Sequence, residues 1–449
     1  MEEKKLTDIK PRGWALIPFL IFIAIYLGAG LILQAQGVEM AFYQFPSVTA
    51  MFIAVVVCFL MTKGNFSERF KLFARGAGKH DIVLMLMIFL LAGAFSQVSA
   101  VAGGRDATVN LGLSVVPAQY LAAGIFVISA FMGTATGTSM GTVGAIVPIA
   151  AGVAMKSGVS LPLVVGACVG GAMFGDNLSM ISDTTIAATS SQGCAMRDKF
   201  RMNFYIALPA AIITIVILLI AGKPETVTPI GDLSYNFWKV LPYLAVLVMA
   251  LCGINVFVVL VSGIILSGAI GMLTHSITIF ECAQAIWDGF TGMNEVFFLT
   301  LFSAGMSEMI THNGGIAWLI AKLRKMMKGK KSAQLGIAAL VTLTDLATAN
   351  NTVAIVVTGN VAKDMSDEFE LDPRKTASIL DIFACVAQGV IPYGAQLLSA
   401  AALTNATLTS GSVNTLDFVP YVWYVWILLV FALVDIFIPY ADKLKKTAA

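Results

Sequence analysis

Four aspartates interrupt stretches of the sequence that are otherwise apolar: Asp176, Asp183, Asp345 and Asp381, with Glu308 closer to the end of such a stretch. A charged group away from water is costly unless it is paired, so acids of this kind are functional hypotheses by default. We find no deep lysine or arginine to pair with them, so we expect a mobile cation, Na+ or H+, to compensate the charge. The alternative is structural: buried protonated or hydrogen-bonded acids, or acids that cap or brace a helix.

Four polar segments accompany these acids. Two are short, Thr-Ala-Thr-Gly-Thr at 134–138 and Thr-Ala-Asn-Asn-Thr at 348–352, and two are longer, at 175–185 and 388–396. Non-helical backbone inside a membrane is tolerated only where it lines a cavity or is buried in protein. These segments offer hydroxyl, amide and carbonyl oxygens, the hard ligands that suit Na+. Helices that begin after such breaks present a positive dipole end, which suits a carboxylate.

The composition requires a surface that faces lipid. Of the 449 residues, 58% are hydrophobic and 12% are charged, whereas soluble domains carry about 25% charged residues. Apolar runs close to the roughly 20 residues that cross a bilayer occur at 14–33, 81–101, 203–221 and 419–440. We therefore predict an all-α polytopic membrane protein. The basic run at 322–331 then indicates topology and contact with lipid rather than a nucleic-acid site.

The two halves of the chain run through the same order of segments. A shift of 214 residues superimposes the two short polar segments, and each half has three spans, two arms around that segment, an interrupted stretch and a last span. The expected segments are 14–33, 46–62, 81–101, 117–155, 161–191 and 203–222, then 237–251, 254–273, 294–311, 332–363, 376–404 and 419–440. We therefore predict two repeats, 1–222 and 237–449.

Charge sets the predicted topology, because Lys and Arg gather in short cytoplasmic loops. With both termini cytoplasmic, all but four of the 28 basic residues fall inside, the exceptions being Arg105, Lys156, Lys223 and Lys239. Each half then crosses an odd number of times, about five, so the second repeat is inverted and 223–236 is an extracellular linker. The paired arms either cross fully or form re-entrant hairpins, which their polar tips favour. Inversion brings the four polar segments together near the bilayer midplane.

The segment Gly-Asp-Asn-x-Ser-x-x-Ser-Asp-Thr-Thr, at 175–185, resembles the signature of the NhaC-type sodium/proton antiporters, which belong to the ion transporter superfamily. The resemblance covers nearly the whole chain. These antiporters usually have proline after the first serine of the motif, where this chain has Met180. In this respect the chain looks like a side branch of the family that is associated with amino acids, including histidine.

The resemblance implies inverted repeats, each with a re-entrant hairpin and a discontinuous helix, and an elevator mechanism. Residues 117–191 and 332–404 would form the moving transport domain, and the other helices a scaffold through which two copies dimerise. The site residues carried over from the family, for substrate or ion, are Thr136, Thr138, Asp176, Asn177, Ser179, Ser182, Asp183, Thr184, Asn350, Asn351 and Thr352, and the deep acids and the second break add Asp345, Pro392 and Tyr393. Among them, the candidate Na+ ligands are Asp176, Asn177, Asp183, Asn350 and Thr352.

The sequence therefore predicts a secondary active transporter of a bacterial cytoplasmic membrane, not an enzyme. Na+ or H+ would be the coupling ion, no cofactor is expected, and the solute would be a small amino acid or carboxylate. The alternative is Na+/H+ antiport without an organic solute. Within the predicted site, Tyr393 could contact the solute or simply pack.

Overall fold

The computed structural model describes residues 9–36, 44–115, 117–180, 182–223, 233–252, 254–325 and 327–441. Throughout these ranges the regular structure is helical, and no strand occurs in them. Seven helical stretches in the described chain are long and apolar enough to cross a membrane, or eight if Thr415–Tyr421 and Trp423–Phe437, bent by 51°, form one span. The prediction of an all-α, multi-pass membrane protein is confirmed. The predicted cytoplasmic termini lie outside the described residues.

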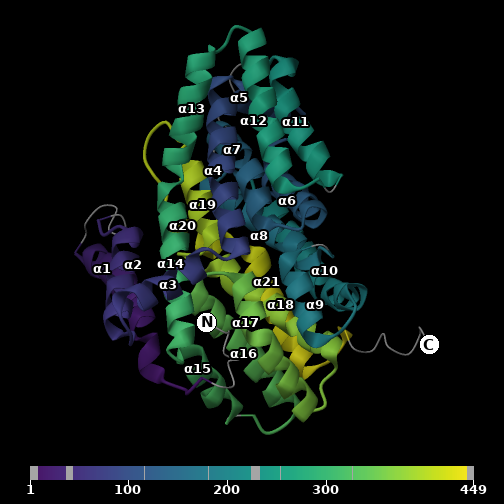
Figure 1. The fold of residues 1–449 in the computed structure, drawn as a ribbon. Helices are drawn as coiled ribbons and strands as arrows, with labels where there is room; N and C mark the ends of the chain where they lie inside the picture. The colour runs from purple at the N-terminus through teal and green to yellow at the C-terminus, as the bar shows by residue number, and fades with distance from the viewer. Residues whose placement is uncertain are drawn as a thin grey trace.

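The helices of the first half form part of the centre of the molecule and also lie beside it (Figure 1). Their bounds are α1 Ile17–Ala35, α2 Ser47–Met61, α3 Phe66–Ala77, α4 His80–Val101, α5 Gly104–Val115, α6 Leu121–Thr136, α7 Ser139–Ser157, α8 Leu161–Leu178, α9 Asp183–Gln192 and α10 Met196–Ala221. Those of the second half are α11 Phe237–Leu251, α12 Val256–Leu273, α13 Ile279–Gly292, α14 Asn294–His312, α15 Gly315–Arg324, α16 Lys330–Thr348, α17 Asn351–Glu368, α18 Pro373–Val390, α19 Ala395–Asn405, α20 Thr415–Phe418 and α21 Trp423–Phe437.

Each short polar segment is the tip of a helical hairpin. In the first, α6 is followed by Gly137, whose φ of 69° is left-handed, and the Thr138 side chain accepts a hydrogen bond from the third residue of the next helix. In the second, Ala349 takes the left-handed place with a φ of 50°, and Asn350 caps α17 in the same way. The predicted tips are therefore helix junctions with a shared backbone geometry.

Each longer polar segment is a break between two helices. Helix α8 ends at Leu178 and α9 begins at Asp183, while α18 ends at Val390 and α19 begins at Ala395. Between equivalent ends of both breaks and both tips the shift is 212 residues. The predicted shift of 214 was therefore wrong at these places, because it aligned similar threonines rather than equivalent backbone. The corrected shift places Gln388 opposite Asp176.

Two amphipathic helices were missed by the search for long apolar runs. Helices α3 and α13 each begin with a capping box, Asn65 with Glu68 and Thr278 with Glu281, a sequence pattern that marks a helix start. Helix α3 packs on α14 from the second half, and α13 packs on α4 from the first. Both helices therefore join the two halves.

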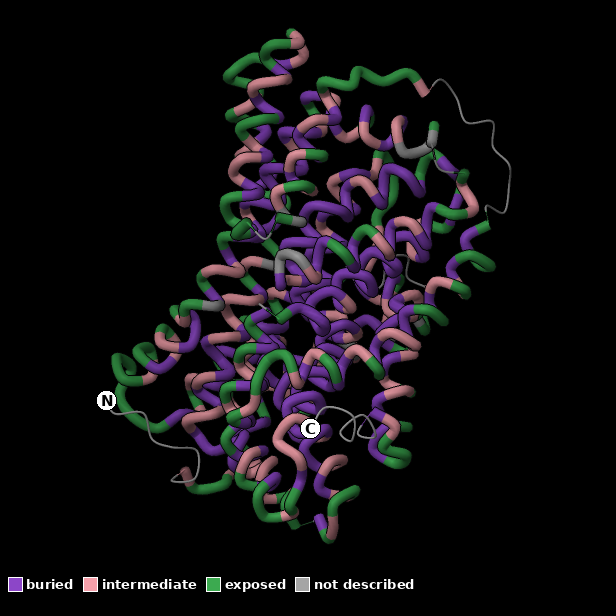
Figure 2. Tube along the Cα trace, turned by 90° about the vertical axis from the view of Figure 1, so that its right-hand side faces the viewer, coloured by how far each residue is buried: buried purple, intermediate pink, exposed green. Residues whose placement is uncertain are grey.

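The centre of the molecule is densely buried, as Figure 2 shows. Glycines let α6 and α8 approach closely: a Cβ on Gly171 would lie 2.3 Å from the Phe126 carbonyl oxygen, and one on Gly175 would lie 2.5 Å from the Thr134 nitrogen. Small residues thus let these two helices pack closely, as they commonly do in membranes. The first hairpin is thus held firmly against the first broken helix.

Candidate functional site

A polar cavity of about 50 Å³ lies where the two hairpin tips and the two breaks meet. All four predicted polar segments contribute to its described lining, and so do Met85, Ser139 and Met140. The residues from the segments are Gly137, Thr138, Asp176, Asp183, Thr184, Asn350, Asn351, Thr352, Gln388 and Gln396. On the scale used for buried waters, this volume has room for about three or four water molecules. The structure therefore brings these segments together, and their role in binding stays a prediction.

Asp176 is held at the floor of this cavity by serines from the tip and from its own break. The carboxylate accepts hydrogen bonds from the Ser139 hydroxyl at 2.7 Å and the Ser139 amide at 3.3 Å, and from the Ser182 hydroxyl at 2.5 Å. The Ser182 and Thr184 hydroxyls lie 2.9 Å apart. Asp176 is 6% exposed, whereas Asp183 is exposed on the cavity. The two acids therefore form an inner and an outer negative position.

Two glutamines continue this network into the second half. Gln396 donates from its amide nitrogen to the Ser139 oxygen at 3.0 Å, and its own oxygen accepts from the Gln388 amide at 2.6 Å. Gln388 also reaches the Ala349 carbonyl at the second tip, 3.4 Å away. A single hydrogen-bonded path thus connects both tips and both breaks. It runs through neutral amides on one side and a carboxylate on the other.

Helix amino termini converge on the same cavity. Its lining includes Thr138 and Ser139 at the start of α7, Asp183 at the start of α9, and Asn351 at the start of α17. These ends carry partial positive charge, so they suit an anionic group. Thr136 closes α6, and its side chain lies outside the described part of the structure.

Asn177 and Ser179 do not belong to the described lining of the cavity, and the Asn177 side chain points into the packing behind the first break. The Asn177 side chain donates to Asp381 at 2.8 Å, and the Ser179 carbonyl accepts from the Thr185 hydroxyl at 2.7 Å. Asp381 also pairs with Lys199, whose nitrogen lies 2.5 Å from the carboxylate and is completely buried. The statement that no deep basic residue pairs with the acids was therefore wrong. Because Lys199 stands between Arg197 and Arg201 in the sequence, its charge was attributed to a cytoplasmic loop rather than to an ion pair inside the protein.

Asp345 is fully buried one turn before the second tip, where its carboxylate lies near the backbone of Asn350 and Gln388 and makes no hydrogen bond of normal geometry with the described residues. An isolated buried carboxylate is costly, so this group is expected to hold a proton or a cation. Glu308, by contrast, is paired with Arg75 and Lys79 at the junction of α3, α4 and α14.

Pro392 and Tyr393 do not belong to the described lining of the cavity. The Tyr393 hydroxyl donates to the Leu346 carbonyl at 2.9 Å, and its ring packs edge-on against Phe22 with centroids 5.1 Å apart. This geometry supports the packing alternative for Tyr393. Gln388, Gln396 and Ser139, which do line the cavity, were not among the predicted site residues.

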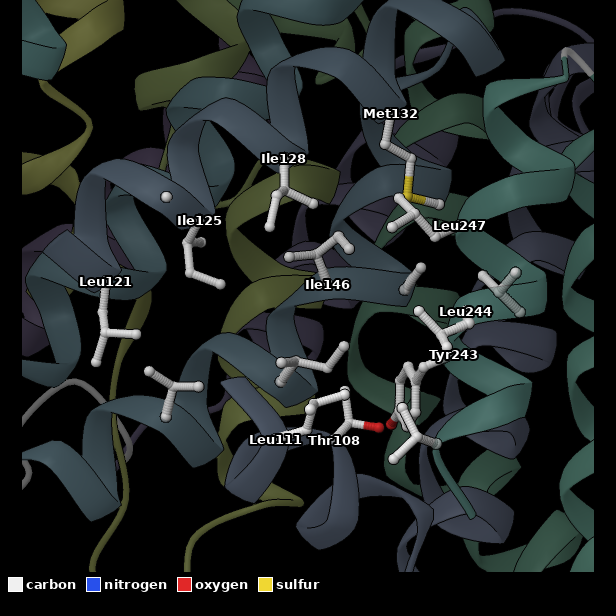
Figure 3. Close-up of a pocket in the computed structure, with 16 residues that line it drawn as sticks. Thr108, Leu111, Leu121, Ile125, Ile128, Met132, Ile146, Tyr243, Leu244 and Leu247 are labelled. Carbon is white, nitrogen blue, oxygen red and sulfur yellow. The ribbon is translucent and has the colours of Figure 1, made fainter. Parts of the chain in front are cut away.

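A larger cavity, of about 210 Å³, lies between α5, α6, α7 and α11, away from the breaks (Figure 3). Its described lining is apolar apart from Thr108 and Tyr243. Figure 3 shows Ile125 and Ile128 of α6 on one side and Leu244 of α11 on the other. Such walls have little to offer an ion or a zwitterion, so we take the smaller polar cavity as the candidate site.

Comparison with known proteins points to one family. A family model described as "Na+/H+ antiporter family" matches residues 2–223 and 224–438. The malate-2H(+)/Na(+)-lactate antiporter of Bacillus subtilis (strain 168) is 22% identical over 93% of this chain and 94% of its own length. The Na(+)/H(+) antiporter NhaC of the same organism is 26% identical over 78% of this chain and 82% of its own. The arginine/ornithine antiporter ArcD of Halobacterium salinarum is 25% identical over 61% of this chain and 64% of its own.

Two solved structures are also similar along nearly the whole chain. The Alcanivorax borkumensis YdaH transporter covers 95% of this chain and 98% of its own, with 11% identity and a TM-score of 0.43. The Neisseria gonorrhoeae MtrF structure covers 96% of each chain, with 13% identity and a TM-score of 0.42.

Proposed function

The chain belongs to the Na+/H+ antiporter family, and on this basis we propose that it is a secondary transporter that couples Na+ or H+ to the movement of a small amino acid or carboxylate. Family membership confirms the resemblance carried by residues 175–185, where the chain was compared with NhaC-type antiporters. The proposed setting is a bacterial cytoplasmic membrane.

The observation that carries the proposal is the division of the cavity into a charged and a neutral side. Asp176 and Asp183 lie on the first break, while the second break and tip contribute the amides of Gln388, Gln396 and Asn351. Carboxylates with neighbouring hydroxyls are suitable ligands for Na+. Amides, which both donate and accept hydrogen bonds, are suitable partners for a polar organic solute. A site for an inorganic ion alone has little use for the second set.

The charges favour an amino acid over a dicarboxylate. No lysine or arginine occurs in the described lining, and two aspartates do. The ammonium group of an amino acid can pair with Asp183, and its carboxylate can meet the amino termini of α7 and α17. A dicarboxylate would bring two more negative charges to a site that already carries two. It would therefore need additional cations to enter.

The packing of the helices supports inverted repeats. Helix α3 packs on α14 as α13 packs on α4, α9 packs on α17 as α19 packs on α7, and α10 packs on α18 as α21 packs on α8. Figure 1 places α1 and α2 at the lower left and α11 and α12 at the upper right, on opposite flanks of the hairpins. We propose that the hairpins and broken helices, 117–191 and 332–404, move as an elevator against the remaining helices. Those flanking helices would form a homodimer.

The size of the cavity favours a second candidate, Na+/H+ antiport without an organic solute. About 50 Å³ accommodates an ion with a few waters, whereas an amino acid requires one of the tips to move outward. In this reading Asp176 binds Na+ and the unpaired Asp345 carries the proton. Both candidates share the ion position and differ in whether the amide side has an occupant.

Uptake of labelled amino acids into proteoliposomes tests the proposal, under an inward Na+ gradient and separately under a pH gradient. We expect uptake of at least one amino acid under one gradient, and loss of that uptake in Asp176→Asn. Gln396→Ala should abolish amino acid uptake but leave Na+-driven proton flux. Proton flux without uptake of any amino acid or carboxylate would establish the antiport alternative instead.

A further inference from the structure

The Lys199 ammonium group occupies an oxygen cage behind the first break. The side chain is completely buried, and its nitrogen lies 2.8 Å from the Asn177 carbonyl oxygen, 2.7 Å from the Thr185 hydroxyl and 2.5 Å from an oxygen of Asp381. An ammonium group has three hydrogen-bond donors, so all of them are used here. The position joins α8, α9 and α10 of the first half to α18 of the second.

The groups around this nitrogen are those that bind a hard monovalent cation. They are a carboxylate, a hydroxyl and a carbonyl. Asn177 lies in the last turn of α8, where carbonyl groups lack helical partners and the helix dipole is negative. The second Asp381 oxygen is buried without a hydrogen-bond partner among the described residues. It is therefore available as a further ligand if a metal ion replaces the ammonium group.

The cage adjoins the transport cavity through the chain itself. Asn177 follows Asp176, and Thr185 follows Thr184, so two of its three oxygen ligands neighbour cavity residues in sequence. A second buried ion pair, Lys375 with Asp435 between α18 and α21, lies at neither break. This pair is the natural comparison, since it has buried charge without a place beside the cavity.

We propose that the Lys199 ammonium is a tethered cation that fills a second cation site between the first broken helix and α18. The chain then couples transport to one mobile ion fewer than it would with a neutral residue at this position. This inference rests on the proposed function, because only a transporter has a coupling ratio. It identifies Lys199 as a positioning residue that determines ion number.

Equilibrium binding of radioactive Na+ to purified protein in detergent tests the proposal, with thermal unfolding measured over a range of Na+ concentrations. In Lys199→Met we expect one additional Na+ bound per chain, and an unfolding temperature that rises with Na+ through this added site. Adding Asp381→Asn should remove the extra ion. Lys375→Met is the matched control, which should lose stability without binding additional Na+.

Two further outcomes separate this inference from the proposed site. In Asp176→Asn the wild-type Na+ response should disappear, while Asp176→Asn combined with Lys199→Met should keep the new one. Loss of both responses overturns the inference alone, whereas an unchanged wild-type response in Asp176→Asn overturns the proposed ion site alone. An unchanged Na+ count in Lys199→Met overturns the inference. The inference is also overturned if Lys199→Met and Lys199→Gln both fail to fold in the presence of Na+ but fold when each is combined with Asp381→Asn. Na+ would then be unable to replace the ammonium group beside Asp381.

Discussion

The two breaks have the same backbone and opposite chemistry. With the shift of 212, Asp176 corresponds to Gln388, and Thr184 corresponds to Gln396. The first member of each pair can hold or assist a cation, and the second is a neutral amide of larger size. Ser182, which donates to Asp176, corresponds to Gly394, which has no side chain to donate. The second break therefore lacks both the charge and the group that orients it.

The two tips also share a backbone geometry and differ in the residue that adopts it. Gly137 adopts its left-handed conformation without strain, whereas Ala349 does so with a Cβ, a conformation that costs an ordinary residue about 1–2 kcal/mol. Strain of this kind persists where the surroundings enforce it, often at functional sites. We conclude that shared geometry was kept while the side chains diverged. In the function proposed here, the first half binds the ion and the second half binds a neutral polar partner.

The largest effect is expected from Asp176→Asn, which removes the inner charge of the first break. Hydrogen bonds to charged groups contribute about 1.5–3 kcal/mol each, and three reach this carboxylate. Losing the charge should reduce ion-driven transport by at least about a hundredfold, since tenfold corresponds to about 1.4 kcal/mol. Initial rates in proteoliposomes measure this.

Moving the acid to the other break is the sharper test of the comparison. In Asp176→Asn with Gln388→Asp, the relocated carboxylate would face Gly394 rather than Ser182, so we expect transport to stay as low as in the single variant. Recovery to within about tenfold of the wild type would contradict the division of roles. The two breaks would then be interchangeable.

Asp345→Asn is expected to separate proton coupling from Na+ binding. Asparagine resembles the protonated carboxyl in shape but cannot release a proton, and the change would break no side-chain hydrogen bond or ion pair in the described structure. We expect transport driven by a pH gradient to fall about tenfold, a loss of about 1.4 kcal/mol, with stability preserved. Na+ binding by the same protein is the control. Unchanged pH-driven flux would exclude Asp345 as the proton carrier.

Ser139→Ala breaks the link between the two halves of the site. Its hydroxyl donates to Asp176 and accepts from Gln396. Ser139→Ala removes both bonds, and a hydrogen bond to a charged group alone contributes about 1.5–3 kcal/mol, so the apparent affinity for the coupling ion should weaken about tenfold. Ser157→Ala, at the far end of α7, is the matched control and should leave affinity unchanged. Equal effects of both variants would indicate a general loss of helix stability.

Much of this arrangement was predictable from the sequence. Long apolar runs marked the spans. Polar residues inside these runs marked the tips and breaks, because unpaired backbone groups and charges are costly in lipid. The contacts across the cavity were not predictable. Ser139 lies one residue beyond the short polar segment, and its partner Gln396 is 257 residues away. Nothing local indicates such a pair.

The register and the buried lysine were missed for different reasons. Matching threonine with threonine aligned Thr138 with Thr352, whereas the equivalent caps are Thr138 and Asn350. Either side chain can cap a helix, so identity was a poor guide to geometry. Lys199 was missed because its charge belongs to a basic cluster in sequence, while its ion pair with Asp381 exists only in three dimensions.

The smallest effect is expected from Tyr393→Phe, which asks whether the second break contributes an aromatic contact to the site. The hydroxyl bonds the Leu346 carbonyl, and the ring packs between Phe22 and Phe19. Phenylalanine preserves that packing and removes one hydrogen bond, which contributes about 1 kcal/mol. We expect a slightly lower unfolding temperature and transport within about twofold of the wild type. Weaker solute affinity at unchanged stability would instead place Tyr393 beside the solute, and the neutral side of the cavity would then extend along the second break toward α1.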